Sequence, residues 1–165
     1  MKKIMIIGNS GSGKSTLARK LSEKTGLPLY HIDMMYWTDK GIPVTRQWFL
    51  EKHNKVVDQE EWIIDGNFAG TMEIRMTACD TIIFLDYPTD VCLDGVRRRI
   101  GTKRPDIPWI ETREDPVFME YVSTYNEKVR PNVIEMIKKY QDKELIVLHS
   151  REEADLFIDT FCMIE

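Results

Sequence analysis

The stretch GNSGSGKS at residues 8–15 decides the fold, because it matches the phosphate-loop pattern G-x-x-x-x-G-K-[ST] at every specified position. It follows the apolar run Ile4–Ile7 and opens a stretch of helical character from Ser15 to Ser22, which is the strand–loop–helix context that such a loop requires. A glycine-rich turn of this kind lets backbone N–H groups converge on phosphate oxygens at the positive end of a helix. The residues predicted to bind nucleotide are Gly8, Ser10, Gly11, Ser12, Gly13, Lys14, Ser15 and Thr16.

Two side chains of this loop have specific predicted roles. Lys14 is expected to reach the β- and γ-phosphates of ATP, and the Ser15 hydroxyl is expected to bind Mg²⁺. The alternative is a glycine-rich turn that binds nothing, and the position of the loop directly after a strand argues against that alternative.

Length and composition suit one ordinary globular domain. The chain has 165 residues, 42% hydrophobic and 30% charged, so residues 1–165 are predicted to form a single domain. The net charge of −4 argues against broad nucleic-acid binding but leaves a local basic patch open. Met1-Lys2-Lys3 precedes an apolar run that is too short for a signal or membrane segment.

The cysteines indicate a reducing environment. Cys79, Cys92 and Cys162 are odd in number and lack CxxC spacing. They predict reduced thiols in a cytoplasmic protein rather than a disulfide framework or a zinc site.

Strand-like and helix-like patterns alternate, which predicts an α/β fold with a parallel sheet wrapped by helices. The expected strands are Lys3–Ile7, Leu27–Ile32, Trp62–Asp65, Thr81–Leu85 and Glu144–Leu148. The expected helices are Lys14–Lys24, Thr45–Asp58, Asp90–Arg99, Phe118–Tyr140 and Glu152–Phe161, with Pro131 kinking or dividing the long one.

Three aspartates are expected at the carboxyl ends of strands, where open α/β sheets bind ligands. They are Asp33, Asp65 and Asp86, and each has an alternative role as a turn or capping residue, which is preferred for Asp86. Asp33 is predicted to accept a hydroxyl proton or to bind the acceptor, and Asp65 to hold Mg²⁺ through water. His31 precedes Asp33 by two positions on the same expected strand, which would give both side chains one face; a packed or surface histidine is the alternative.

Arginines surround the one segment without periodicity, Ile100–Pro116, which carries three prolines. A structureless stretch of this length inside a compact domain is functional or disordered. Arg99, Arg104 and Arg130 suit a lid that closes over transferring phosphates. The alternative for each is a solvated surface position.

These motifs together resemble the adenylate-kinase-like P-loop kinases, and among them the proteins labelled "DNA topology modulation protein". The resemblance covers nearly the whole chain and rests on Gly8–Thr16, His31–Trp37, Trp62–Phe68, Asp80–Asp86 and Lys103–Asp106. It implies a three-layer P-loop NTPase fold with a five-stranded parallel sheet in the order 2-3-1-4-5 and a short lid at about residues 100–118. That order would put Asp65 beside the phosphate loop, which makes it the preferred metal-side carboxylate together with Ser15.

The resemblance also implies roles for other residues. Arg99, Arg104 and Arg130 would contact phosphates, the loop His149–Glu152 would hold the adenine, and residues 33–75 would bind the acceptor. Asp33 is similar to the aspartate that handles a hydroxyl acceptor in shikimate and gluconate kinases. The chain departs from the Asp-Gly-Phe-Pro-Arg segment of adenylate kinases after Asp65-Gly66, and the nearest arginine that would substitute as a monophosphate contact is Arg75.

The leading prediction is therefore an ATP-dependent kinase that uses ATP and Mg²⁺ and acts on a small, nucleotide- or nucleoside-like acceptor. Two alternatives stay open. One is a nucleotide-dependent regulatory ATPase that binds nucleic acid or a partner protein, against which the acidic pI of about 5.5 argues. The other is a polynucleotide 5′-end kinase.

Overall fold

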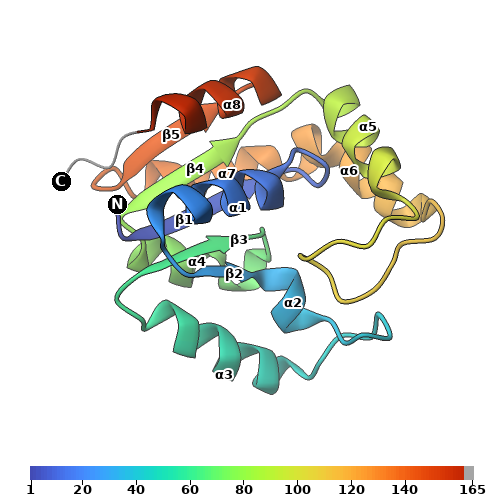
Figure 1. The fold of residues 1–165 in the computed structure, drawn as a ribbon, viewed down its shortest axis with the longest axis horizontal. Helices are drawn as coiled ribbons and strands as arrows, with labels where there is room; N and C mark the ends of the chain where they lie inside the picture. Colours follow the sequence, from blue (N-terminus) through green and yellow to red (C-terminus); the bar gives the residue numbers. More distant parts are fainter. Residues whose placement is uncertain (162–165) are drawn as a thin grey trace.

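The computed structural model describes residues 1–161, and they form one five-stranded parallel sheet with helices on both faces (Figure 1). The strands are β1 (Lys3–Gly8), β2 (Leu29–His31), β3 (Trp62–Asp65), β4 (Thr81–Leu85) and β5 (Glu144–Leu148). Their order is β2-β3-β1-β4-β5, and all four pairings are parallel. The predicted sheet and its order are confirmed.

Two hydrophobic cores separate the three layers. Alternate residues of β1 face opposite sides of the sheet, as the period of a strand requires. Ile4 and Ile6 join one core with α1 (Lys14–Thr25) and α8 (Arg151–Thr160). Met5 and Ile7 join the other core, which is completed mainly by α3 (Arg46–Val57), α4 (Ala69–Ala78) and α7 (Arg130–Lys138). Because Ile4–Ile7 of β1 are fully buried, the phosphate loop that follows starts from a well-packed strand.

The second strand is shorter than predicted. β2 ends at His31, which pairs with Asp65, the last residue of β3. Because this edge strand has no other neighbour, the chain has no pairing partner beyond His31, and it turns into the short helix α2 (Ile32–Tyr36). The prediction that Asp33 ends a strand and shares a face with His31 is therefore wrong, since Asp33 lies in the first turn of α2.

The remaining helices are close to the predicted ones, with three main differences. The expected long helix is divided into α6 (Pro116–Lys128) and α7, with Pro131 in the first turn of α7, where a proline is tolerated. Helix α5 (Thr89–Arg99) begins one residue earlier than expected. Helix α4 was not among the expected helices, because Gly70 and Thr71 are weak helix formers in its first turn.

Of the lid predicted at about residues 100–118, residues 100–115 contain neither helix nor strand, and residues 116–118 form the start of α6. The segment 100–115 connects α5 to α6 and arches toward α2 at the carboxyl end of the sheet (Figure 1). Within residues 1–161, no helix has both the length and the apolar character that crossing a bilayer would require. Cys79 and Cys92 are buried free thiols, and Cys162 lies outside the described residues.

Candidate active site

The lysine of the phosphate loop is hydrogen-bonded to the backbone of that loop. Lys14 Nζ donates to the carbonyl oxygens of Gly8 at 3.0 Å and Asn9 at 2.9 Å. Gly8, Gly11 and Gly13 have φ values of 148°, 81° and 99°, which favour glycine. Burial lowers the pKa of Lys14 because it disfavours the charged ammonium form. A phosphate ligand would stabilise that ammonium group by placing negative charge beside it.

The backbone of helix α5 packs directly against the backbone of the phosphate loop. A Cβ on Gly11 would lie 2.0 Å from the carbonyl oxygen of Cys92, and a Cβ on Gly95 would lie 2.0 Å from the carbonyl oxygen of Gly11. Glycine is therefore required on both sides of this contact. Gly95 was missed by sequence reasoning, because a single glycine within a helical pattern carries no signal of what packs against it.

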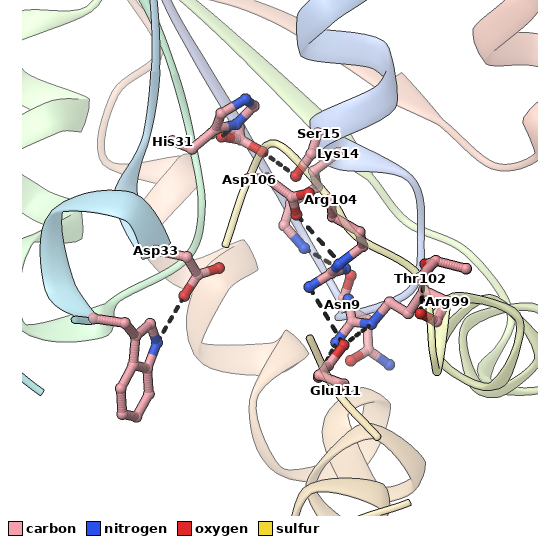
Figure 2. Close-up of polar contacts among 12 residues, drawn as sticks. Asn9, Lys14, Ser15, His31, Asp33, Arg99, Thr102, Arg104, Asp106 and Glu111 are labelled. Carbon is pink, nitrogen blue, oxygen red and sulfur yellow. Dashed lines mark hydrogen bonds and ion pairs between the residues drawn. The ribbon is translucent and has the colours of Figure 1, made fainter. Parts of the chain in front are cut away.

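Asp65 connects the phosphate loop to β2. Its Oδ2 accepts a hydrogen bond from Ser15 Oγ at 2.6 Å, and its Oδ1 lies 2.6 Å from His31 Nδ1 (Figure 2). Burial works against the charged form of His31, but the hydrogen bond and the charge of Asp65 outweigh it and raise the pKa of this histidine. His31 is thus a hydrogen-bond partner of Asp65. The sequence did not indicate this contact, because the two residues lie 34 positions apart in the chain.

Ser15 and Asp65 have the chemistry of a magnesium site. A hydroxyl and a carboxylate held at hydrogen-bond distance are hard oxygen donors, and Mg²⁺ in nucleotide sites takes one or two protein ligands with phosphates and water completing its shell. Among residues 1–161, no group of three or more His, Cys, Asp or Glu side chains is placed to hold a metal ion. The donor set therefore fits Mg²⁺ bound together with a nucleotide.

Asn67 clamps the start of the phosphate loop. Its Oδ1 accepts from the Gly8 N–H at 3.1 Å and its Nδ2 donates to the Gly8 carbonyl at 2.7 Å. Beneath this turn Arg75 is fully buried, and its guanidinium donates to the carbonyls of Gly66 and Asn67 and to Thr71 Oγ1. Arg75 supports the turn from behind and does not line the cavities described below.

Arg99 and Arg104 meet at the lid (Figure 2). Arg99 Nε lies 3.0 Å from Glu111 Oε2, and Arg104 Nη2 lies 3.4 Å from the same oxygen. Arg104 Nη1 also lies 3.6 Å from Asp106 Oδ2. Acidic side chains of the lid thus neutralise both guanidinium groups next to the phosphate loop.

Three neighbouring cavities surround the loop and share lining residues. One of about 430 Å³ lies toward α8 and is lined by Arg98, Arg151 and Ala154. A second, of about 270 Å³, lies between the loop and the two lid arginines. A third, of about 770 Å³, extends toward α2 and brings together Lys14, Ser15, Asp33, Asp65, Arg99 and Arg104. Ser10 lines it as well, so seven of the predicted site residues face one cavity.

Asp33 faces this third cavity from α2, across from the arginines (Figure 2). Its Oδ1 accepts a hydrogen bond from Trp37 Nε1 at 3.2 Å. Burial raises the pKa of the Asp33 carboxyl above its ordinary value, which makes it a better proton acceptor when ionised.

Other expected residues lie elsewhere. Arg130 makes a bidentate pair with Asp86, at 2.6 and 2.7 Å, and lines none of the three cavities. At the expected adenine loop, the cavity toward α8 is lined by Arg151 but not by His149.

A family model described as "PduV-EutP: Ethanolamine utilisation - propanediol utilisation" matches residues 1–89. The chain belongs to this family. The PduV-EutP match spans the phosphate loop, Asp33, Asp65 and Asn67, whereas the lid and the helices from α6 onward lie beyond it. The chain is also 37% identical over 105 residues to the "Uncharacterized protein YqaC" of Bacillus subtilis (strain 168). That match covers 59% of this chain and 56% of the relative, so it spans about half of the relative's length.

Solved structures share the fold of this PduV-EutP member. A shikimate kinase from Bacteroides thetaiotaomicron has a TM-score of 0.58 at 17% identity, covering 94% of this chain and 93% of that one. A deoxyadenosine kinase from M. mycoides has a TM-score of 0.53 at 19% identity, covering 94% and 96%. A shikimate kinase from Aquifex aeolicus has a TM-score of 0.54 at 17% identity, covering 94% and 90%. At these identities the likeness shows a P-loop kinase fold.

Proposed function

We propose that this protein is an ATP-dependent kinase that transfers the γ-phosphoryl group of ATP to a small, nucleotide- or nucleoside-like acceptor. The observation that carries the proposal is the position of the phosphate loop between two cavities, with a carboxylate in the cavity on the side away from α8. A site that only binds or hydrolyses nucleotide does not need a second cavity of about 770 Å³ that Asp33 lines together with Lys14 and Ser15.

The nucleotide would lie along the loop. The cavity toward α8 has the size for a base and ribose, and the guanidinium groups of Arg98 and Arg151 line it. The phosphates would follow the backbone N–H groups of residues 8–15 to Lys14. Ser15 and Asp65 would hold Mg²⁺, which when bound neutralises charge on the β- and γ-phosphates.

The chemistry assigned to the chain is positioning and charge stabilisation. Asp33 would accept a hydrogen bond from the acceptor hydroxyl and take its proton as the oxygen bonds to the γ-phosphorus. The bond from that phosphorus to the bridging oxygen breaks, and ADP leaves. Arg99 and Arg104 would turn from Glu111 and Asp106 to the phosphoryl oxygens, because the charge that develops there exceeds that of a carboxylate.

The similarity to proteins labelled "DNA topology modulation protein" remains part of the proposal, supported by the motifs at residues 31–37, 62–68 and 103–106. We also propose that residues 1–165 form a single domain, on the basis of length and composition, and that the protein is cytoplasmic, on the basis of its cysteine pattern.

The first test is Lys14→Ala. The variant removes the ammonium group that faces the β- and γ-phosphates, and we expect roughly a 100-fold loss of MgATP affinity, since charged hydrogen bonds are worth about 1.5–3 kcal/mol. Lys55→Ala, an exposed lysine of α3 outside the cavities, is the control and should bind MgATP like the parent protein. Calorimetric titration measures both, and equal affinity in the Lys14 variant would refute nucleotide binding at this loop.

A further inference from the structure

Aromatic side chains from four parts of the chain line the cavity of about 770 Å³. They come from α2 and the residue that follows it, the turn before α4, the lid and α6, and they are Tyr36, Trp37, Phe68, Trp109, Phe118 and Tyr121. The ring centroids of Tyr36 and Phe68 are 4.7 Å apart, and those of Trp37 and Trp109 are 5.2 Å apart. These rings, half-buried except for the exposed Tyr121, offer faces to a planar, apolar part of a ligand.

The lid contributes one side of this wall. Trp109 lies in the segment between α5 and α6 and packs edge-on, at 73°, against Trp37, the residue that follows α2. Phe68 is the one non-glycine residue with a positive φ among residues 1–161, at 42°. Such strained conformations persist where the surrounding structure enforces them and concentrate at ligand sites.

Three of the five cations that line this cavity are already engaged. Lys14 donates to backbone carbonyls, Arg99 pairs with Glu111, and Arg104 pairs with Asp106 and Glu111. The cavity's other two cations, Lys40 and Arg113, are exposed side chains at its rim.

An acceptor phosphate would therefore meet no unpaired guanidinium except that of Arg113, whose exposed side chain is screened by solvent. Once ATP binds, Arg99 and Arg104 face the transferring phosphate, and Arg75 is locked beneath the Gly66–Phe68 turn. Asp33 and Asp65 add negative charge to the same walls. A dianionic group that enters a partly desolvated cavity without paired cations loses more hydration energy than it regains.

A hydroxyl fits where a phosphate does not. One oxygen of Asp33 accepts from Trp37, and no donor from residues 1–161 bonds the other oxygen, which leaves it available to an acceptor hydroxyl (Figure 2). The aromatic wall and this carboxylate belong to one cavity, whose volume exceeds what a small hydroxy acid fills.

We infer that the acceptor is an uncharged nucleoside, whose base lies against the aromatic wall and whose sugar hydroxyl faces Asp33, and not a nucleoside monophosphate. This rests on the proposed kinase function. The hydroxyl oxygen forms the bond to the γ-phosphorus, the bridging P–O bond of ATP breaks, and the proton passes to the Asp33 carboxylate. The products are ADP and a nucleoside monophosphate.

The test measures ADP formation by the full chain at saturating MgATP against matched pairs of ribo- and deoxyribonucleosides and their 5′-monophosphates, with hydroxylated acids beside them. We expect at least one nucleoside to accelerate ADP formation about tenfold or more, and its own monophosphate not to do so. Mass spectrometry of the product checks that a nucleoside monophosphate has formed.

Variants separate the two parts of the inference. Trp109→Ala should raise the KM for the nucleoside about tenfold with unchanged ATP affinity, because stacking of a base on an aromatic ring is worth about 1–3 kcal/mol. Trp48→Ala, an exposed tryptophan of α3 outside this cavity, is the matched control and should leave KM unchanged. Trp109→Phe keeps an aromatic face and should retain most of the affinity, which guards against a folding defect in the alanine variant. Asp33→Asn should lower kcat about 10²- to 10⁴-fold with unchanged ATP affinity.

The outcomes are distinguishable. Acceleration by monophosphates alone would overturn the nucleoside inference and leave the kinase proposal standing. Acceleration by hydroxylated acids alone would overturn the nucleoside inference and the nucleotide-like acceptor, and would leave only ATP-dependent phosphoryl transfer. A KM that is insensitive to Trp109→Ala would overturn the assignment of the base to the aromatic wall. MgATP binding without transfer to any acceptor would overturn both proposals.

Discussion

At the residue scale, Asn67 has the clearest role that no motif reveals. Both polar atoms of its amide bond the backbone of Gly8, so it holds the first residue of the phosphate loop at a fixed distance from the end of β3. Asn67→Ala should destabilise the protein by about 2 kcal/mol, at about 1 kcal/mol for each lost bond, and lower Tm by roughly 4–8 °C. It should also weaken MgATP binding, because the loop would lose its anchor.

Asn132→Ala is the control for this prediction, since Asn132 is an exposed residue of α7. Thermal unfolding and ATP titration of the two variants are compared. A normal MgATP affinity in a destabilised Asn67 variant would show that the clamp serves the fold and not the site.

The same scale shows which residues sequence reasoning can find. Lys14 and Ser15 follow from a motif whose members are neighbours in the chain. The position of Asp65 beside the phosphate loop could be predicted from the expected strand order, because that order places β3 next to β1. The bond between Asn67 and Gly8 and the locked position of Arg75 depend on side-chain packing, which a pattern does not encode. Arg130 was expected to contact phosphates because of its charge, but in the structure its guanidinium pairs with the Asp86 carboxylate.

At the element scale, the contact of α5 with the phosphate loop depends on a glycine on each side. Gly95→Ala would put a Cβ 2.0 Å from the carbonyl oxygen of Gly11, and because both neighbours are backbone the helix must move. We expect a loss of about 1–3 kcal/mol in unfolding free energy, the usual effect of overpacking, together with weaker MgATP binding.

Gly70→Ala supplies the matched control in α4, where an added Cβ meets nothing within 4 Å. This substitution should stabilise the protein by about 0.5–1 kcal/mol, because alanine is the better helix former. Denaturant unfolding measures both variants, and a Gly95 variant as stable as the Gly70 variant would refute the close contact.

Element boundaries were predictable where a strong pattern coincided with a full set of neighbours. The central strands β1, β3 and β4 lie within one residue of their expected bounds, since long apolar runs buried on both faces are unambiguous. β2 was overextended because its pattern continues through Ile32 while its only neighbouring strand ends at Asp65. The contact between Trp109 of the lid and Trp37, which follows α2, could not be predicted, because it joins two irregular regions.

At the scale of the whole molecule, one site joins segments that lie far apart in the sequence. The part that matches the PduV-EutP model carries the phosphate loop and Asp65, while Arg99, Arg104 and Arg151 come from beyond residue 89. A nucleotide bound along the loop would therefore contact both parts and stabilise them together. At a free concentration 100 times its Kd, MgATP should add about 2.7 kcal/mol to the unfolding free energy and raise Tm by roughly 5–10 °C.

Hydrogen exchange locates this effect within the molecule. MgATP should slow exchange of backbone amides in three separate places: residues 8–16, residues 99–111 at the end of α5 and in the lid, and the start of α8. The last two places are expected because the phosphates would order the lid and the base would contact α8. The Lys14→Ala variant should show neither the Tm shift nor the protection. Protection confined to residues 8–16 would mean that the nucleotide contacts the loop alone, and the arginines of the lid would then have no part in holding ATP.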